Sequence, residues 1–114
     1  MADHIEAIMR PFLHFVGEPT HSRLERLAGF AVIAWNISRE SPQKTWPDEI
    51  EKELDRLRPH TTDPGALRPF RTLLDRMLPI AAAIAPENQR SVLDAGVRLR
   101  ADGRWRLVIR SFDP

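Results

Sequence analysis

The sequence predicts an α+β fold: a four-helix N-terminal part with a central apolar helix (about residues 22–38), followed by a C-terminal antiparallel β-hairpin (about residues 91–100 and 104–112). Three observations support this prediction. The length of 114 residues suits one domain, so we expect residues 1–114 to form a single domain. The segment from Leu27 to Ile37 is apolar on almost every helical face. After residue 87 the apolar spacing changes from helical to alternating, which is typical of strands.

The first predicted helix covers residues 3–16, with Asp3 as its N-cap. Its apolar residues are spaced as on one helix face: Ile5, Ile8, Met9, Phe12 and Val16. Pro11 removes a backbone donor inside this pattern, so we expect a kink or a break near residues 7–10. Gly17 and Pro19 should end the helix.

The second predicted helix has a capping-box pattern at its start, because Glu25 follows Ser22 by three residues, and Thr20 is an alternative cap one turn earlier. It should end near Ser38. Since it lacks a polar face from Leu27 onward, other elements must surround it, and we expect it to be the centre of the core. Asn36, in this apolar context, is interpreted as a hydrogen-bonded structural group.

Two further helices follow. The pattern of residues 45–57 predicts a surface helix with Pro47 in its first turn. This helix should have a narrow apolar stripe and an otherwise acidic surface. Asp63 and Pro64 are expected to start the fourth helix. Pro69 and Pro79 interrupt it, so we expect the helix to start at Pro69, to kink at Pro79, or both. Its apolar stripe is Leu67, Phe70, Leu74, Met77, Ala81 and Ile84.

The register of the hairpin follows from its alternating pattern. A three-residue loop, 101–103, with Gly103 in the left-handed conformation, pairs Leu99 with Trp105 and matches the two apolar faces, whereas a two-residue loop would mix them. The apolar face then consists of Leu93, Ala95, Val97, Leu99, Trp105, Leu107 and Ile109. Trp105 is interpreted as a core residue beneath the hairpin. A lone hairpin is marginally stable, so this one should pack on the helices or join strands of another chain.

The same register places arginines opposite one another on the other face. Arg100 faces Arg104 and Arg98 faces Arg106, while Asp94 faces Arg110. Like charges across a strand pair cost up to about 1 kcal/mol per pair, so we expect a compensating contact. These five residues, which we call the arginine face, are the candidate partner or phosphate contacts: Arg98, Arg100, Arg104, Arg106 and Arg110.

Three interpretations of the arginine face remain open. In the first interpretation, it is a solvated surface, and either the arginine stems lie over the sheet or the acidic third helix neutralises part of the charge. It is a protein interface, since arginine is enriched at interfaces and strand edges pair readily. In the third interpretation, it contacts the phosphates of RNA or DNA. The pI of the chain, about 8.4, argues against this third interpretation.

Composition excludes several chemistries. The chain has no cysteine and no tyrosine, which rules out thiolate or tyrosyl nucleophiles, disulfides and zinc–cysteine sites within it. The net charge of +1 conceals an imbalance, because residues 1–57 carry 7 basic and 10 acidic residues and residues 58–114 carry 10 and 6. The histidines lack a metal-ligand spacing, so we expect no metal and no cofactor: His4, His14, His21 and His60.

We therefore expect a small non-catalytic protein with an interaction or regulatory role, acting through self-association or a protein partner at the hairpin. The alternative is binding of a nucleic-acid backbone by the arginine face. The chain begins with an acidic Met1-Ala2-Asp3 segment, and its longest apolar run, 11 residues, is too short to span a bilayer. We accordingly expect a cytoplasmic location and no membrane partner.

Overall fold

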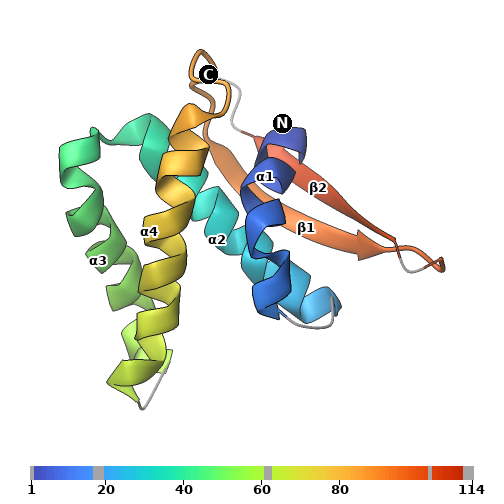
Figure 1. Ribbon diagram of the computed structural model, residues 1–114, viewed down its shortest axis with the longest axis horizontal. Coiled ribbons are helices and arrows are strands. Elements are labelled where there is room, and N and C mark those ends of the chain that lie inside the picture. The colour runs from blue at the N-terminus through green and yellow to red at the C-terminus, as the bar shows by residue number, and fades with distance from the viewer. Residues whose placement is uncertain (1, 17–19, 61–62, 103, 112–114) are drawn as a thin grey trace.

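The computed structural model describes residues 2–16, 20–60, 63–102 and 104–111. Four α-helices in this part of the chain are followed by an antiparallel two-stranded hairpin, which confirms the predicted α+β class (Figure 1). The α-helices and strands are α1 (Ala2–Met9), α2 (His21–Glu40), α3 (Trp46–Leu57), α4 (Arg68–Ala83), β1 (Val92–Leu99) and β2 (Trp105–Ser111). Between them lie the 3-10 helices η1 (Arg10–Val16), η2 (Gln43–Thr45), η3 (Arg58–His60) and η4 (Pro64–Leu67).

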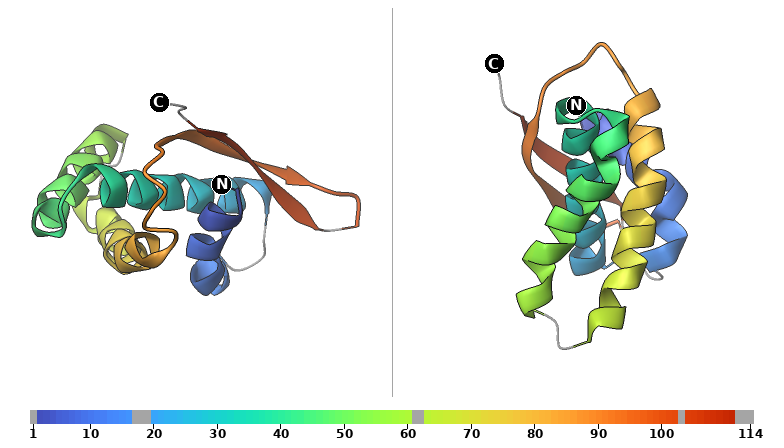
Figure 2. Two further views of the ribbon diagram at one scale, coloured as in Figure 1. Left: turned by 90° about the horizontal axis from the view of Figure 1, so that it is seen from above. Right: turned by 90° about the vertical axis from the view of Figure 1, so that its left-hand side faces the viewer.

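Helix α2 is the central element, as predicted. The hairpin covers one side of it, and α1 and α4 cover the other (Figure 2). The helix begins at His21 and not at Ser22, because Thr20 is the N-cap and its Oγ1 accepts from the Arg23 N–H at 3.3 Å. The predicted capping box at Ser22 is therefore wrong, and the alternative cap, Thr20, is confirmed. The helix also continues two residues beyond Ser38, to Glu40.

Proline sets the ends of the outer helices. The α-helix α1 gives way to η1 at Arg10, directly before Pro11, which confirms the predicted break. The residues expected to end this segment, 17 and 19, lie outside the described part. Asp63 caps η4, where its side chain accepts from the Gly65 N–H at 2.9 Å. The α-helix α4 starts at Arg68 with Pro69 in its first turn, which agrees with the predicted alternative of a start at Pro69, and Pro79 lies inside the helix.

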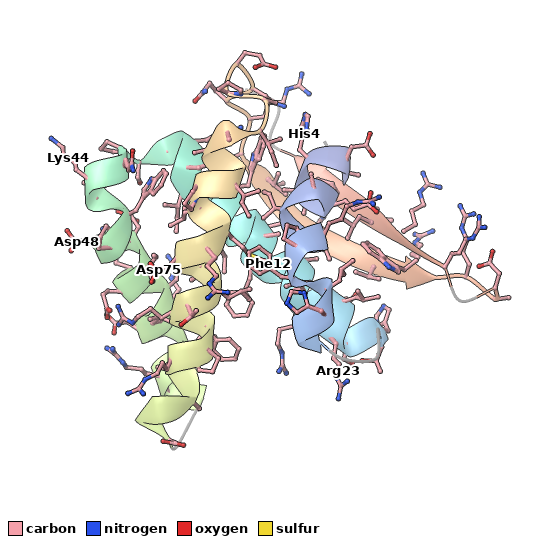
Figure 3. All side chains as sticks on the ribbon, in the orientation of Figure 1. His4, Phe12, Arg23, Lys44, Asp48 and Asp75 are labelled. Carbon is pink, nitrogen blue, oxygen red and sulfur yellow. The ribbon has the colours of Figure 1, made fainter. Side chains whose placement is uncertain are left out.

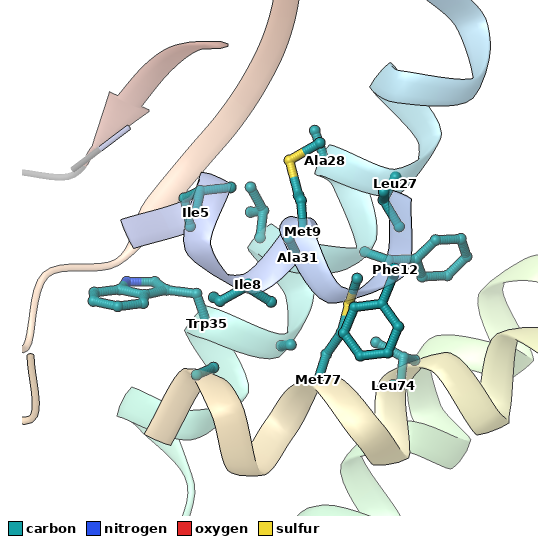
Figure 4. Packing of buried hydrophobic residues seen from close by; sticks show 14 of the residues in the cluster. Ile5, Ile8, Met9, Phe12, Leu27, Ala28, Ala31, Trp35, Leu74 and Met77 are labelled. Atoms are coloured by element: carbon teal, nitrogen blue, oxygen red, sulfur yellow. The ribbon is translucent and has the colours of Figure 1, made fainter. Parts of the chain in front are cut away.

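The core joins α1, α2 and α4. Trp35 is its largest fully buried side chain, and Figure 4 shows Ile5 and Ile8 of α1 packed beside Trp35 of α2. The Trp35 indole N–H donates to the Arg90 carbonyl at 2.7 Å, which ties the core to the chain just before β1. Every buried side-chain polar atom in the described residues has a hydrogen-bond partner.

The hairpin register is the predicted one. Leu99 pairs with Trp105, Val97 with Leu107 and Ala95 with Ile109. Residues 103 and 112, which the prediction also used, lie outside the described part. Trp105 is partly buried and packs against the core cluster, so it lies at the edge of the core. The tip of the hairpin extends past the helices (Figure 1).

The alternation fails at Leu93. A bulge between Val92 and Asp94 leaves Leu93 without a cross-strand partner and 57% exposed, so the prediction that it faces the core is wrong. Val92 takes the inward position, where it is 3% exposed. The cause is Asn36, whose Nδ2 donates to the Val92 carbonyl at 2.8 Å and whose Oδ1 accepts from the Val92 N–H at 2.7 Å.

Arg39 fixes the segment between α4 and β1, a role the sequence analysis missed. Its guanidinium stacks on Trp35, 3.6 Å from the ring centroid, and donates to the carbonyls of Ala81, Ile84, Ala85 and Asn88. Burial lowers the pKa of Arg39, and Glu87 opposes this in part.

Candidate functional site: the projecting hairpin

The arginine face lies on the side of the hairpin that points away from the helices. Its five arginines are exposed, and the tip of the hairpin projects well beyond the helical part (Figures 1 and 2). The structure confirms the opposed pair Arg98 and Arg106 and the pair Asp94 and Arg110. Arg100 and Arg104 are also neighbours, since the Arg100 N–H donates to the Arg104 carbonyl at 2.7 Å.

Only part of this charge is neutralised. The Arg110 Nε lies 3.0 Å from both carboxylate oxygens of Asp94. That hydrogen bond lowers the pKa of Asp94 and raises the pKa of Arg110. The Arg104 Nε lies 3.8 Å from Asp102. For Arg98, Arg100 and Arg106, no described carboxylate lies within ion-pair distance.

The acidic helix α3 does not cover the arginine face. The expectation that the third helix neutralises part of the arginine charge is therefore wrong. Helix α3 packs against α4, at the end of the molecule opposite the hairpin tip, where Lys44 and Asp48 are labelled in Figure 3. Its carboxylates pair locally: Glu49 with Lys52, Glu53 with Arg56, and Glu51 with Arg58 and Arg71.

The two outer edges of the hairpin differ. The hydrogen bond between Arg100 and Arg104 fixes the alternation of the ladder, so the N–H and C=O groups of Val97 point away from β2. On this β1 edge, His21 Nε2 lies 2.7 Å from the Val97 carbonyl, and Glu25 accepts from the Val97 N–H at 3.5 Å. Side chains of α2 therefore occupy the β1 edge at Val97.

The outward backbone groups of β2 have no such side-chain partners among the described residues, although α1 contacts this strand. The same alternation directs the backbone groups of Trp105, Leu107 and Ile109 away from β1. Within residues 2–16, 20–60, 63–102 and 104–111, no side chain and no other backbone segment hydrogen-bonds to them. Unpaired groups in a row are the template on which another strand pairs.

A shallow hollow lies mostly over β1, with Glu25 of α2 among the residues that line it. Gly96 has no side chain and no atom near its Cβ position, so Val108, its cross-strand neighbour, is 40% exposed. The hollow has a volume of about 290 Å³, and Arg98 and Arg110 are among the residues that line it. Two carboxylates, of Glu25 and Asp94, line it as well, so its charge is mixed.

A second feature was missed by the sequence analysis: a groove of about 910 Å³ on the helical part. It lies between the N-terminal halves of α2 and α4 and includes η1. One sequence pattern could have indicated this groove, because four of its lining residues are spaced so that they share one face of α2: Arg23, Arg26, Leu27 and Phe30. The sequence alone did not show that α4 leaves this face partly open.

Other site types find no support in the described residues. They contain no group of three His, Asp or Glu side chains able to hold a metal ion. No helix among them is both long and apolar enough to cross a bilayer. No family model, no curated protein and no solved structure matches the chain.

Proposed function

We propose that the protein is a non-catalytic binding protein whose projecting hairpin docks a partner protein by strand addition to β2. The observation that carries the proposal is the asymmetry of the two edges. Side chains of α2 occupy the outward backbone groups of β1 at Val97, while those of Trp105, Leu107 and Ile109 on β2 have no hydrogen-bond partner among the described residues. Main-chain bonds supply affinity in this binding mode, and alternate side chains supply specificity.

The charges define the chemistry of the partner strand. A strand added beside β2 places alternate side chains next to Arg104, Arg106 and Val108, on the arginine face. Carboxylates at those positions would offset the repulsion between the opposed arginines. The intervening side chains would lie beside the half-buried Trp105 and Ile109. The partner strand is therefore expected to alternate acidic and apolar residues.

A second copy of β2 fits this edge less well. If two copies pair antiparallel with their arginine faces on the same side, a register centred on any of residues 105–108 brings at least one arginine opposite another. An acidic strand avoids this repulsion. We therefore favour a different protein over self-association as the occupant.

The test uses a synthetic peptide that alternates Glu and Val, and a matched peptide with Lys in place of Glu. The Glu peptide should bind and should slow hydrogen exchange at the amides of Trp105, Leu107 and Ile109. Arg106→Glu should weaken binding about fivefold or more, because it removes one attraction and adds one repulsion. Lys44→Glu makes the same charge change at the far end of the molecule and should leave binding unchanged.

Three outcomes oppose the proposal. Equal weakening by Lys44→Glu would show only a net-charge effect. Binding without protection of the three β2 amides would place the peptide elsewhere. A solution mass of twice 13.1 kDa, with those amides already protected, would assign the edge to a second copy.

A second candidate function is binding to a nucleic-acid backbone. The supporting observation is that Arg98, Arg100 and Arg106 carry no described acidic partner on a two-stranded ribbon, a shape that fits a major groove. If four arginines contact phosphates, affinity for duplex DNA or RNA should fall roughly 150-fold between 50 and 200 mM salt. Absence of binding at 50 mM salt would eliminate this function.

A further inference from the structure

The groove between α2 and α4 has an apolar floor. Phe12 of η1 lies beside Leu27 and Leu74 (Figure 4), and Phe30 stacks on Phe70 with ring centroids 5.0 Å apart. Phe70 and Leu73 are half-buried, so the floor is accessible from solvent. The hairpin contributes no residue to the lining of this groove.

Arginines stand on both flanks of this floor. Arg23 and Arg26 come from α2, and Arg68 and Arg76 come from α4. Each of the four is exposed. In the part of the chain that the structure describes, Arg26, Arg68 and Arg76 have no carboxylate within ion-pair distance, whereas the neighbouring Arg71 is paired with Glu51. The two flanks are therefore cationic while the floor is apolar.

We propose that this groove binds an acidic amphipathic helix of a partner protein. Such a helix seats an apolar stripe, spaced i, i+3, i+4 and i+7, on the floor and carries carboxylates on both sides of the stripe. Arg68 and Arg76 are eight residues apart on α4, which corresponds to about 12 Å along the helix axis, or about two turns of the bound helix. A ligand with a single carboxylate would pair with only one flank.

The groove and the hairpin are independent sites. The groove requires a helix with acidic flanks, and the β2 edge requires an extended strand. A single partner that contains both elements is compatible with the geometry, but neither proposal needs the other.

The test measures fluorescence anisotropy with two labelled helical peptides that share one stripe of leucines and carry either Glu or Lys on both flanks. The Glu peptide should bind, and the Lys peptide should bind at least about tenfold more weakly. Arg26→Glu and Arg76→Glu, on opposite flanks, should each weaken binding of the Glu peptide about fivefold. Leu73→Gln, which reduces the apolar floor at a half-buried position, should also weaken it.

Two controls carry the same charge change elsewhere. Lys44→Glu and Arg106→Glu should leave binding of the Glu helix unchanged, and circular dichroism should show that every variant is folded. Equal binding of both peptides, or equal weakening by Lys44→Glu, would overturn the proposal. Displacement of the peptide by equimolar laurate would assign the groove to a small amphiphilic anion and overturn it as well.

Discussion

Asn36 shows how one side chain on α2 determines the shape of the hairpin. Its amide makes both a donor and an acceptor bond to the backbone of Val92. These two bonds hold Val92 against the helix, and the adjacent bulge leaves Leu93 on the surface. The sequence indicated a structural role for this residue, but its partner lies 56 positions away.

Asn36→Ala should lower the free energy of unfolding by about 2 kcal/mol, because it leaves the N–H and C=O of Val92 without their partners. Hydrogen exchange at the Val92 amide should become faster. Gln43→Ala, at an exposed position of η2, is the control and should change stability by less than about 0.5 kcal/mol. Equal stabilities of the two variants in urea unfolding would contradict the assigned role of Asn36.

The ion pair between Asp94 and Arg110 predicts a pH dependence. Because the pair lowers the pKa of Asp94 in the folded state, its contribution is present above the ordinary aspartate pKa of about 3.9 and is lost as pH falls through the lower folded value. Asp94→Asn should therefore reduce stability at neutral pH and have little effect at about pH 2. An NMR titration should show the Asp94 pKa rising towards its ordinary value in Arg110→Gln. A difference between wild type and Asp94→Asn that does not vary with pH would refute this assignment.

At the scale of elements, α2 is a long helix covered on two sides. It contacts α1 and α4 through its apolar residues and the hairpin through His21, Glu25 and Asn36. The helix thus positions both candidate sites: its side chains occupy the β1 edge, and its N-terminal half forms one wall of the groove.

Gly29→Ala tests the geometry of this helix. A Cβ at Gly29 would meet no atom within 4 Å, so the substitution should raise the free energy of unfolding by about 0.5–1 kcal/mol through helix propensity alone. At Gly65 a Cβ would lie 3.3 Å from Oδ1 of Asp63, the oxygen that caps η4. Gly65→Ala should bring no such gain. Thermal unfolding of both variants shows which substitution raises stability more. A larger gain from Gly65→Ala than from Gly29→Ala would contradict this prediction.

At the scale of the whole molecule, charge is separated although the net charge is +1. The acidic residues of α3 pair with nearby basic residues, while the hairpin and the groove carry exposed arginines without described acidic partners, among them Arg98, Arg106, Arg26 and Arg76. The molecule therefore presents two cationic surfaces, one on a strand pair and one on a helix pair.

The projection of the hairpin predicts a gradient of hydrogen exchange. Amides of the ladder near the tip, at Arg98, Arg100 and Arg106, should exchange faster than those of α2 between residues 27 and 37, because the tip has few buried contacts beneath it. Exchange should slow towards Val92 and Val97, where α2 holds the strand. Uniform protection along the hairpin in the free protein would show that the tip is already covered.

The sequence by itself determined the local features: the α+β class, the central helix, the break before Pro11 and the hairpin register. These depend on the periodicity of neighbouring residues and on proline chemistry, which act over a few positions. The register in turn placed the five arginines on one face. The apolar stripe of α4 was also predicted, since Leu74, Met77 and Ala81 are buried.

Only the tertiary structure decided which surfaces are covered. It showed that Thr20 and not Ser22 caps α2, that Arg39 holds the segment before β1, and that Leu93 faces outward. It also placed α3 away from the arginine face and left the β2 edge and the groove open. The physical reason is that these features arise from contacts between segments far apart in the chain, and a local pattern fixes the face of an element but not what packs against it.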